Sequence, residues 1–241
     1  MNHSDLYKAY GVAHFRHTAV IRIGSYDSMA RFFRANYRKH LPSNRSSCIA
    51  DLGCGAGHFL YYLDGEGYEN VHGVDLSEEM VQICHHAGLT KAIHGDVLPF
   101  LAHKQQQFDA IVCNDLIEHI PREHMIEFVT AARKALSGGV FLVKTINAGS
   151  LFGAREVFVD FTHELGFTPE SLAQVLRMGG FSSVEILPLR PAPQRVAGRV
   201  VKGINIGLIE PVIKGFIKLT EGPGTRNPMV VSQSMLAVAR V

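Results

Sequence analysis

The sequence lacks paired cysteines and lacks an excess of charge of either sign. Its four cysteines, Cys48, Cys54, Cys84 and Cys113, form no C-x-x-C pair, so neither a zinc cage nor a disulfide framework is indicated. Lys and Arg number 24 against 22 Asp and Glu, which gives a formal charge of +2. This balance excludes a protein that binds nucleic acid mainly through phosphate contacts, and we expect no nucleic-acid partner.

Long apolar runs are also missing. No stretch approaches the ~18 consecutive apolar residues of a membrane-spanning helix, and the N-terminal MNHSDLYKAYG lacks the apolar core of a secretory signal. We therefore expect a soluble, cytoplasmic protein. Hydrophobic residues make up 46% of the 241 and charged residues 19%, which is enough for one large folded core with an appendage.

Apolar segments alternate with helical patterns along most of the chain. We predict an N-terminal helical cap over 1–46, ended by Pro42, a core over 47–190, a helical insertion over 191–231 and a last core strand over 232–241. The expected strands lie at 47–53, 70–76, 91–96, 108–114, 139–146, 182–189 and 232–241. Ser77 and Thr168 are expected to cap helices, and a helix after Pro121 is expected to present Met125, Val129, Ala132 and Leu136 on one face. This alternation predicts a mostly parallel α/β sheet, which binds ligands beyond the carboxyl ends of its strands.

The first of these strand ends carries the sequence Asp51-Leu52-Gly53-Cys54-Gly55-Ala56-Gly57. The glycines allow a tight turn in which a ligand can approach bare backbone at a helix N-terminus. The carboxylate before the first glycine would repel a pyrophosphate but suits a ligand with an ammonium group. Asp75 ends the second strand, where a carboxylate can accept both hydroxyls of a ribose, and Asp96 ends the third, where it could accept from an exocyclic amine.

Four strand ends together resemble the class I S-adenosylmethionine-dependent methyltransferases: IADLGCGAG (49–57), GVDLS (73–77), GD (95–96) and FDAIVCNDLIEHI (108–120). The resemblance implies a Rossmann-like, doubly wound α/β sheet of seven strands in the order 3-2-1-4-5-7-6, with the last strand antiparallel. It also implies that S-adenosylmethionine is the methyl donor. The residues implied to bind it are Asp51, Gly53, Cys54, Gly55 and Gly57 at the methionine end, Asp75 and Leu76 at the ribose, Asp96 and Val97 at the adenine, and Asn114 beside the sulfonium.

A second motif follows the fourth strand. Asp115, Glu118 and His119 form D-x-x-E-H, and His163 lies in a later T-H-E segment. The pair of motifs is similar to that of the O-methyltransferases of ubiquinone biosynthesis, in which E-x-x-E-H and T-H-D form a divalent-metal site. The resemblance implies that Asp115, Glu118, His119 and His163 hold Mg²⁺, Mn²⁺ or Zn²⁺. Two alternatives remain: His119 or His163 is a metal-free catalytic base, or Glu118 and His119 merely hold the loop in place.

The expected reaction is methyl transfer to a hydroxyl. The acceptor expected first is a sugar of a glycan or glycolipid intermediate, as in bacterial surface-polysaccharide biosynthesis, and the alternative is a phenolic quinone precursor or another small molecule. A non-catalytic S-adenosylmethionine-binding module is the hypothesis from another class. The insertion is expected to form two basic, amphipathic helices broken at Pro211, either as a lid packed on residues 1–40 or as a peripheral membrane contact.

Overall fold

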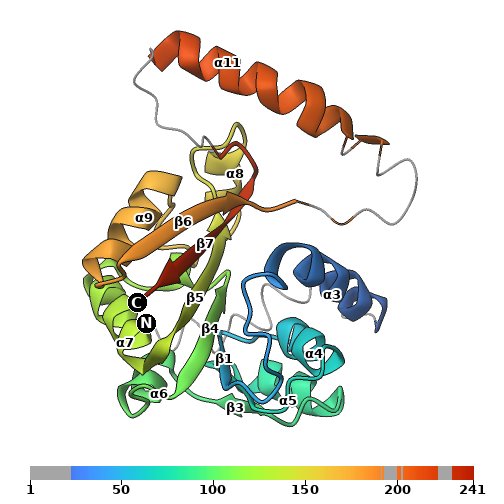
Figure 1. Ribbon diagram of the computed structural model, residues 1–241, viewed down its shortest axis with the longest axis vertical. Coiled ribbons are helices and arrows are strands. Elements are labelled where there is room, and N and C mark those ends of the chain that lie inside the picture. Colours follow the sequence, from blue (N-terminus) through green and yellow to red (C-terminus); the bar gives the residue numbers. More distant parts are fainter. Residues whose placement is uncertain (1–22, 191, 193–199, 202, 222–229) are drawn as a thin grey trace.

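The structure is a computed structural model that describes residues 23–190, 192, 200–201, 203–221 and 230–241. At its centre is a seven-stranded sheet in the order β3-β2-β1-β4-β5-β7-β6 (Figure 1). Strand β7 pairs antiparallel with both of its neighbours and every other pairing is parallel. The expected strand order and antiparallel last strand are therefore confirmed. The strands are β1 (Ile49–Leu52), β2 (Val71–Asp75), β3 (Ala92–His94), β4 (Phe108–Asn114), β5 (Leu136–Ile146), β6 (Ser183–Pro188) and β7 (Ser234–Arg240).

Helices cover both faces of the sheet. On one face lie α3 (Ile23–Tyr37), α4 (His58–Gly65) and α5 (Glu78–His86), and on the other α6 (Val97–Ala102), α7 (Met125–Ala135) and α9 (Pro169–Met178). Ser77 and Thr168 cap α5 and α9 through their side chains, as expected. The short segments η2 (Ile117–His119), η3 (Arg122–His124) and α8 (Gly153–Val157) lie at strand ends. A cluster of buried apolar side chains packs against each face of the sheet. A central strand such as β4 is therefore buried on both sides.

Helix α3 is the described part of the predicted N-terminal cap, whose first 22 residues lie outside the described part of the chain. It packs aromatic side chains at helical spacing against α4: Tyr26, Phe33 and Tyr37 are buried, and the Phe33 ring meets Phe59 edge-on at 4.8 Å. The helix ends at Tyr37, before Pro42. Its penultimate residue, Asn36, exchanges two hydrogen bonds with the backbone of Arg190 just after β6.

Two details of the predicted elements differ from the structure. Leu136 was expected on the helix after Pro121, but α7 ends at Ala135 and Leu136 is the first residue of β5. Pro211 was expected to break the insertion into two helices. Instead it is the second residue of α11 (Glu210–Glu221), directly after a π-helical turn, η4 (Asn205–Ile209). Proline has no N–H to donate to the preceding turn. The wider π-helical turn tolerates this missing hydrogen bond, so the helix continues past Pro211.

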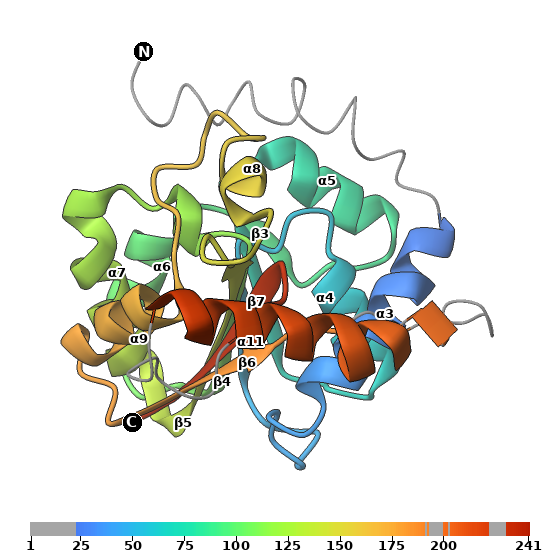
Figure 2. The ribbon, with the colours of Figure 1, turned by 90° about the horizontal axis from the view of Figure 1, so that it is seen from above.

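The insertion is bracketed by β6 and β7, which pair with each other from Ser183–Arg240 to Pro188–Met235. Helix α11 stands away from the sheet (Figure 1), and in the view from above it passes over β6 and β7 (Figure 2). The Arg190 guanidinium binds both carboxylate oxygens of Glu210 at 2.8 and 3.0 Å. The outer face of the helix is apolar and exposed at Val212, Phe216 and Leu219, with exposed fractions of 63%, 69% and 89%. No helix in the described part of the chain is long and apolar enough to cross a membrane.

Candidate active site

The turn after β1 is built on left-handed backbone. Gly53, Gly55 and Gly57 have φ values of +65°, +51° and +80°, a conformation that glycine adopts without strain. A Cβ on Gly57 would also lie 2.8 Å from the Cys84 Sγ and 2.7 Å from Leu89. The turn therefore needs glycine for conformation, and at Gly57 also for space, and it leads directly into α4 at His58.

Two buried polar atoms beside this turn have no hydrogen-bond partner among the described residues. They are Oδ2 of Asp51, in β1, and Nδ2 of Asn114, at the end of β4. Burial, with Asp75 nearby, raises the pKa of Asp51 well above its usual value. An unpartnered buried carboxylate is costly unless a cation or donor satisfies it. The ammonium group of a bound methyl donor fits that need.

Asp75, at the end of β2, closes the other side of the turn. Its Oδ2 accepts a hydrogen bond from the Gly55 N–H at 2.7 Å, and its Oδ1 accepts from the Ser77 N–H at 2.8 Å. Burial raises the pKa of Asp75, and these two bonds oppose that shift. A carboxylate offers about four lone-pair positions, so capacity remains for the two hydroxyls of a ribose.

Asp96 follows β3 and caps α6, where its side chain accepts from the Leu98 N–H at 2.9 Å. Asp96, Asp75 and Asp51 line one cavity of about 1130 Å³, large enough for a nucleoside donor together with a second molecule. Of the residues implied by the resemblance, Gly57 is the one that does not line this cavity. The others all line it: Asp51, Gly53, Cys54, Gly55, Asp75, Leu76, Asp96, Val97, Asn114, Asp115, Glu118, His119 and His163.

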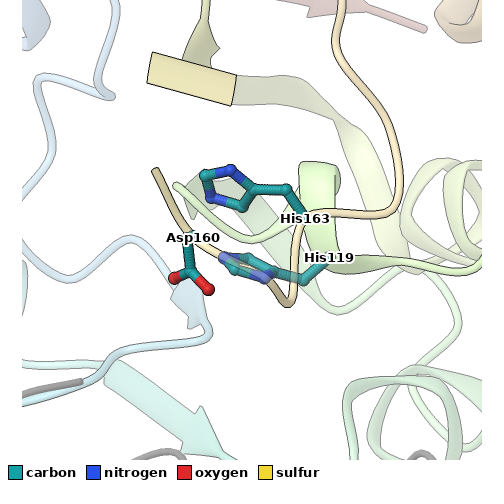
Figure 3. Close-up of side chains that lie close together, drawn as sticks. All are labelled: His119, Asp160 and His163. Atoms are coloured by element: carbon teal, nitrogen blue, oxygen red, sulfur yellow. The ribbon is translucent and has the colours of Figure 1, made fainter. Parts of the chain in front are cut away.

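At the same cavity, His119 and His163 approach each other with ring centroids 4.7 Å apart (Figure 3). The third member of the cluster is Asp160, and one ligand atom from each of the three lies within 4.8 Å of the others. Two hydrogen bonds from the backbone N–H groups of Glu164 and Leu165 to the Glu118 carbonyl bring the loop after α8 against η2. Asp160 was not among the predicted ligands, because its approach to His119 depends on this contact between segments far apart in the sequence.

The nitrogens of the two imidazoles have defined surroundings. His163 Nδ1 lies 2.7 Å from the Val157 carbonyl, which can only accept, so Nδ1 carries a proton and Nε2 is the nitrogen that could bind a metal ion. His119 Nδ1 lies 3.0 Å from the Thr162 hydroxyl, which itself donates to Asp160. Burial and the neighbouring His163 lower the pKa of His119 to about 4. Its imidazole is therefore neutral near pH 7, the form that binds metal ions.

The two carboxylates of the D-x-x-E-H motif have different partners. Asp115 has φ +51°, outside helical geometry, and its side chain pairs with the Lys144 ammonium. Glu118 is 2% exposed; its Oε2 accepts from the Thr145 hydroxyl at 3.0 Å and its Oε1 has no partner among the described residues. Burial, reinforced by Asp115, raises the pKa of Glu118 to about 8. The unpartnered Glu118 oxygen and the two imidazoles line the same cavity, and carboxylates and imidazoles are ligand types that divalent cations bind.

Five exposed apolar side chains surround α8 beside this cluster: Leu151, Phe152, Phe158, Val159 and Phe161. Phe158 and Phe161 are 85% and 92% exposed. Between them Val159 and Asp160 line the cavity, so one short segment presents aromatic rings outward and site residues inward. A patch of this kind beside a site marks a surface for interaction.

Comparisons with known proteins match most of this chain to methyltransferases. The family described as "Methyltransferase domain" matches residues 26–186, about two thirds of the chain. A ubiquinone biosynthesis O-methyltransferase of Xylella fastidiosa is 28% identical over 193 residues, covering 73% of this chain and 77% of that protein.

Solved structures agree at the level of the fold. A SAM-dependent methyltransferase from Archaeoglobus fulgidus has a TM-score of 0.65 at 20% identity, covering 88% of this chain and 94% of that one. A phosphoethanolamine N-methyltransferase 2 of Haemonchus contortus, in complex with S-adenosyl-L-methionine, has a TM-score of 0.61 at 16% identity, covering 98% of this chain and 59% of that one.

Proposed function

This chain belongs to the methyltransferase-domain family and is an S-adenosylmethionine-dependent methyltransferase, and from that membership we propose that it methylates a hydroxyl of a small phenolic acceptor. The observation that carries the proposal is the polar cluster of His119, Asp160 and His163 in the same cavity as the unpartnered Asp51 carboxylate. Methyl transfer to a hydroxyl needs a donor site and, within reach of it, groups that accept the hydroxyl proton or stabilise the negative charge left on the oxygen.

The donor half of the proposed site is the glycine turn with its carboxylates. In this assignment Asp51 receives the donor's ammonium group, Asp75 the ribose hydroxyls, and Asp96 with Val97 the adenine. The turn itself lets the methionine part lie against backbone, because no side chain projects from Gly53 or Gly55. Support comes from the unpartnered Asp51 Oδ2 and from the position of all these residues around one cavity.

The acceptor is proposed to be phenolic rather than the glycan hydroxyl that we expected first. The named function of the Xylella relative, ubiquinone biosynthesis O-methylation, favours the phenolic alternative. Chemistry favours it as well, because a phenol ionises near pH 10, as the tyrosine side chain does. A base or a bound cation at the histidine cluster can therefore assist its deprotonation near neutral pH.

The acceptor proposal is tested by supplying S-adenosylmethionine labelled in its methyl group together with separate pools of catechols, polyprenylated phenols, oligosaccharides and glycolipids. We expect label in a phenolic pool, in an ether that resists alkali. Label only in the oligosaccharide or glycolipid pool would move the acceptor to a sugar hydroxyl. Label on a nitrogen atom would contradict O-methylation itself.

We further propose that His119, His163 and Asp160 hold a divalent cation, and that Glu118, which lines the same cavity, is a further ligand. The support is the grouping of the three side chains and the neutral state of His119. Asp115, expected to be a ligand, is paired with Lys144 and is left out of this set. Such a cation would stabilise the negative charge of an ionised acceptor oxygen.

Chelation tests the metal. We expect exhaustive chelation to abolish turnover and one added divalent metal to restore it. His163→Ala should weaken metal binding by more than the 10–100-fold seen for groups that merely support ligands, whereas His86→Ala, on the exposed end of α5, should not change it. Full turnover after chelation, with a large loss in His163→Ala, would show a metal-free base instead.

We also propose peripheral contact with an anionic membrane surface through α11 and the segment around α8. The exposed apolar face of α11 is accompanied by Lys214 and Lys218, a combination that suits the interface of an anionic bilayer. The segment around α8, which carries the exposed phenylalanines, lies at the same end of the molecule as α11 (Figure 1). Contact there would bring an acceptor with an apolar chain to the cavity.

A further inference from the structure

The hydroxyl of Tyr37 contacts the site from outside the motifs. Tyr37 is the last residue of α3, is fully buried, and lies among aromatic rings, with the Phe33 and Phe59 centroids each at 5.4 Å. Its hydroxyl donates a hydrogen bond to the Asn114 Oδ1 at 2.6 Å. Burial, together with the nearby carboxylates Asp115 and Asp51, raises the pKa of Tyr37, so the phenol keeps its proton and remains a donor.

This hydrogen bond fixes the orientation of the Asn114 amide, that is, on which side its oxygen lies and on which side its nitrogen lies. A carboxamide presents an oxygen on one side and an N–H₂ group on the other, and its two orientations differ little in shape. Because a phenol proton needs an acceptor, Tyr37 fixes the oxygen toward α3. The nitrogen then lies on the other side, where it is buried at the cavity wall and has no hydrogen-bond partner among the described residues.

The position of Asn114 indicates which part of the donor this nitrogen meets. In the register of β1 against β4, Cys113 pairs with Leu52, so Asn114 stands beside Gly53 in the glycine turn. Asp51 lies just before that turn. A donor whose ammonium group binds Asp51 must place its carboxylate close by, and that carboxylate needs N–H donors to offset the negative charge of Asp51.

We propose that Tyr37 is a positioning residue for the methyl donor, which orients the Asn114 amide so that its N–H donates to the donor's carboxylate. The inference rests on donor binding alone and is independent of which acceptor is methylated. An amide without this bond can rotate and turn its oxygen toward the carboxylate, which replaces attraction by repulsion.

The test is calorimetric titration of the whole protein with three ligands, without acceptor. For Tyr37→Phe we expect about three- to tenfold weaker binding of S-adenosylmethionine and S-adenosylhomocysteine, the effect of one lost hydrogen bond. Binding of 5′-methylthioadenosine, which has no carboxylate, should not change. Asn114→Ala should show the same ligand pattern, and adding Tyr37→Phe to it should have no further effect.

Tyr68→Phe is the matched control, because Tyr68 is also buried and its hydroxyl donates to the Pro42 carbonyl, away from the cavity. It should leave all three affinities unchanged, and melting curves report any loss of folding separately. Unchanged binding of S-adenosylmethionine in Tyr37→Phe would overturn the proposal. Equal weakening of all three ligands, or a full additional loss in the Asn114→Ala background, would overturn it too, because either result means general damage to the site.

Discussion

At the scale of single residues, the site gathers carboxyl groups whose burial is unfavourable to the folded protein. Asp51, Asp75 and Glu118 all have pKa values raised by burial. Each is more easily ionised in the unfolded chain than in the folded one, so each reduces stability at neutral pH. A cost of this kind is expected where a bound ligand supplies the missing partner. Binding of the methyl donor or of a metal ion should therefore raise the free energy of unfolding strongly.

Glu118 gives the clearest pH dependence. Its pKa rises from 4.5 to about 8 on folding, so the folded state keeps a proton that the unfolded state loses. The stability of the chelated protein should consequently fall as pH rises from about 4.5 to 8. Glu118→Gln removes this contribution and should be more stable than the wild type, by a margin largest at pH 8 and above and small near pH 5.

Denaturant unfolding of the wild type and Glu118→Gln across that pH range measures the margin. His119 titrates in both proteins, so its own effect cancels in the difference. A stability difference between the two proteins that is constant with pH, or that grows toward acid, would contradict the raised pKa of Glu118 in the folded state.

Residue spacing identified most of the candidate site, but it could not identify Asp160. Asp51, Asp75 and Asp96 were found because each lies at or near the end of an apolar strand, and strand ends meet at one edge of a parallel sheet. Asp115, which the resemblance implied to be a metal ligand, has a positive φ and pairs with Lys144. Asp160 reaches the histidines through contacts between the loop after α8 and the Glu118 carbonyl, which no local pattern encodes.

At the scale of elements, apolar period and capping residues predicted the sheet and its helices well, since these depend on local sequence. The insertion was harder to predict, because its apolar pattern fits both a lid and a surface helix. In the structure the apolar side chains Val212, Phe216 and Leu219 of α11 are exposed, and an ion pair between Arg190 and Glu210 joins the helix to the chain just after β6. Packing of α11 on residues 1–40 therefore receives no support from the described part of that segment.

The exposed face of α11 makes membrane binding directly measurable. The protein should float with vesicles that contain phosphatidylglycerol and much less with phosphatidylcholine alone, because Lys214 and Lys218 each add about 1 kcal/mol near an anionic surface. Replacing Val212, Phe216 and Leu219 together by serine should abolish flotation. Donor affinity should remain unchanged.

A matched control is the double change Ile93→Ser and Met178→Ser, two residues exposed at 50% and 61% that belong to neither surface. That control should float like the wild type. The double variant Phe158→Ser and Phe161→Ser tests the contribution of the α8 segment to flotation separately from that of α11. If the wild type binds neither kind of vesicle, the membrane proposal is wrong for both surfaces.

At the scale of the whole molecule, the strand order followed from family resemblance, not from periodicity. Alternating apolar segments indicate a parallel sheet with covered faces, but they do not say which strands are neighbours. The reversal of β7 is likewise a long-range property, set by pairing between Ser234–Arg240 and two strands far away in sequence. The acceptor depends on the walls of the cavity, which are assembled from separate loops, and sequence spacing therefore leaves it open.

The pairing of β6 with β7 has a consequence for how such a protein can diversify. The two strands hold the ends of the 190–231 segment together, since Leu189 donates to the Ser234 carbonyl and Pro188 lies opposite Met235. A segment whose ends are already joined can lengthen, shorten or be replaced at a small entropic cost, without shifting the sheet or the donor pocket. Mutation and selection could thus exchange this segment as a module, and one catalytic body could acquire new acceptors or new locations while its chemistry stays constant.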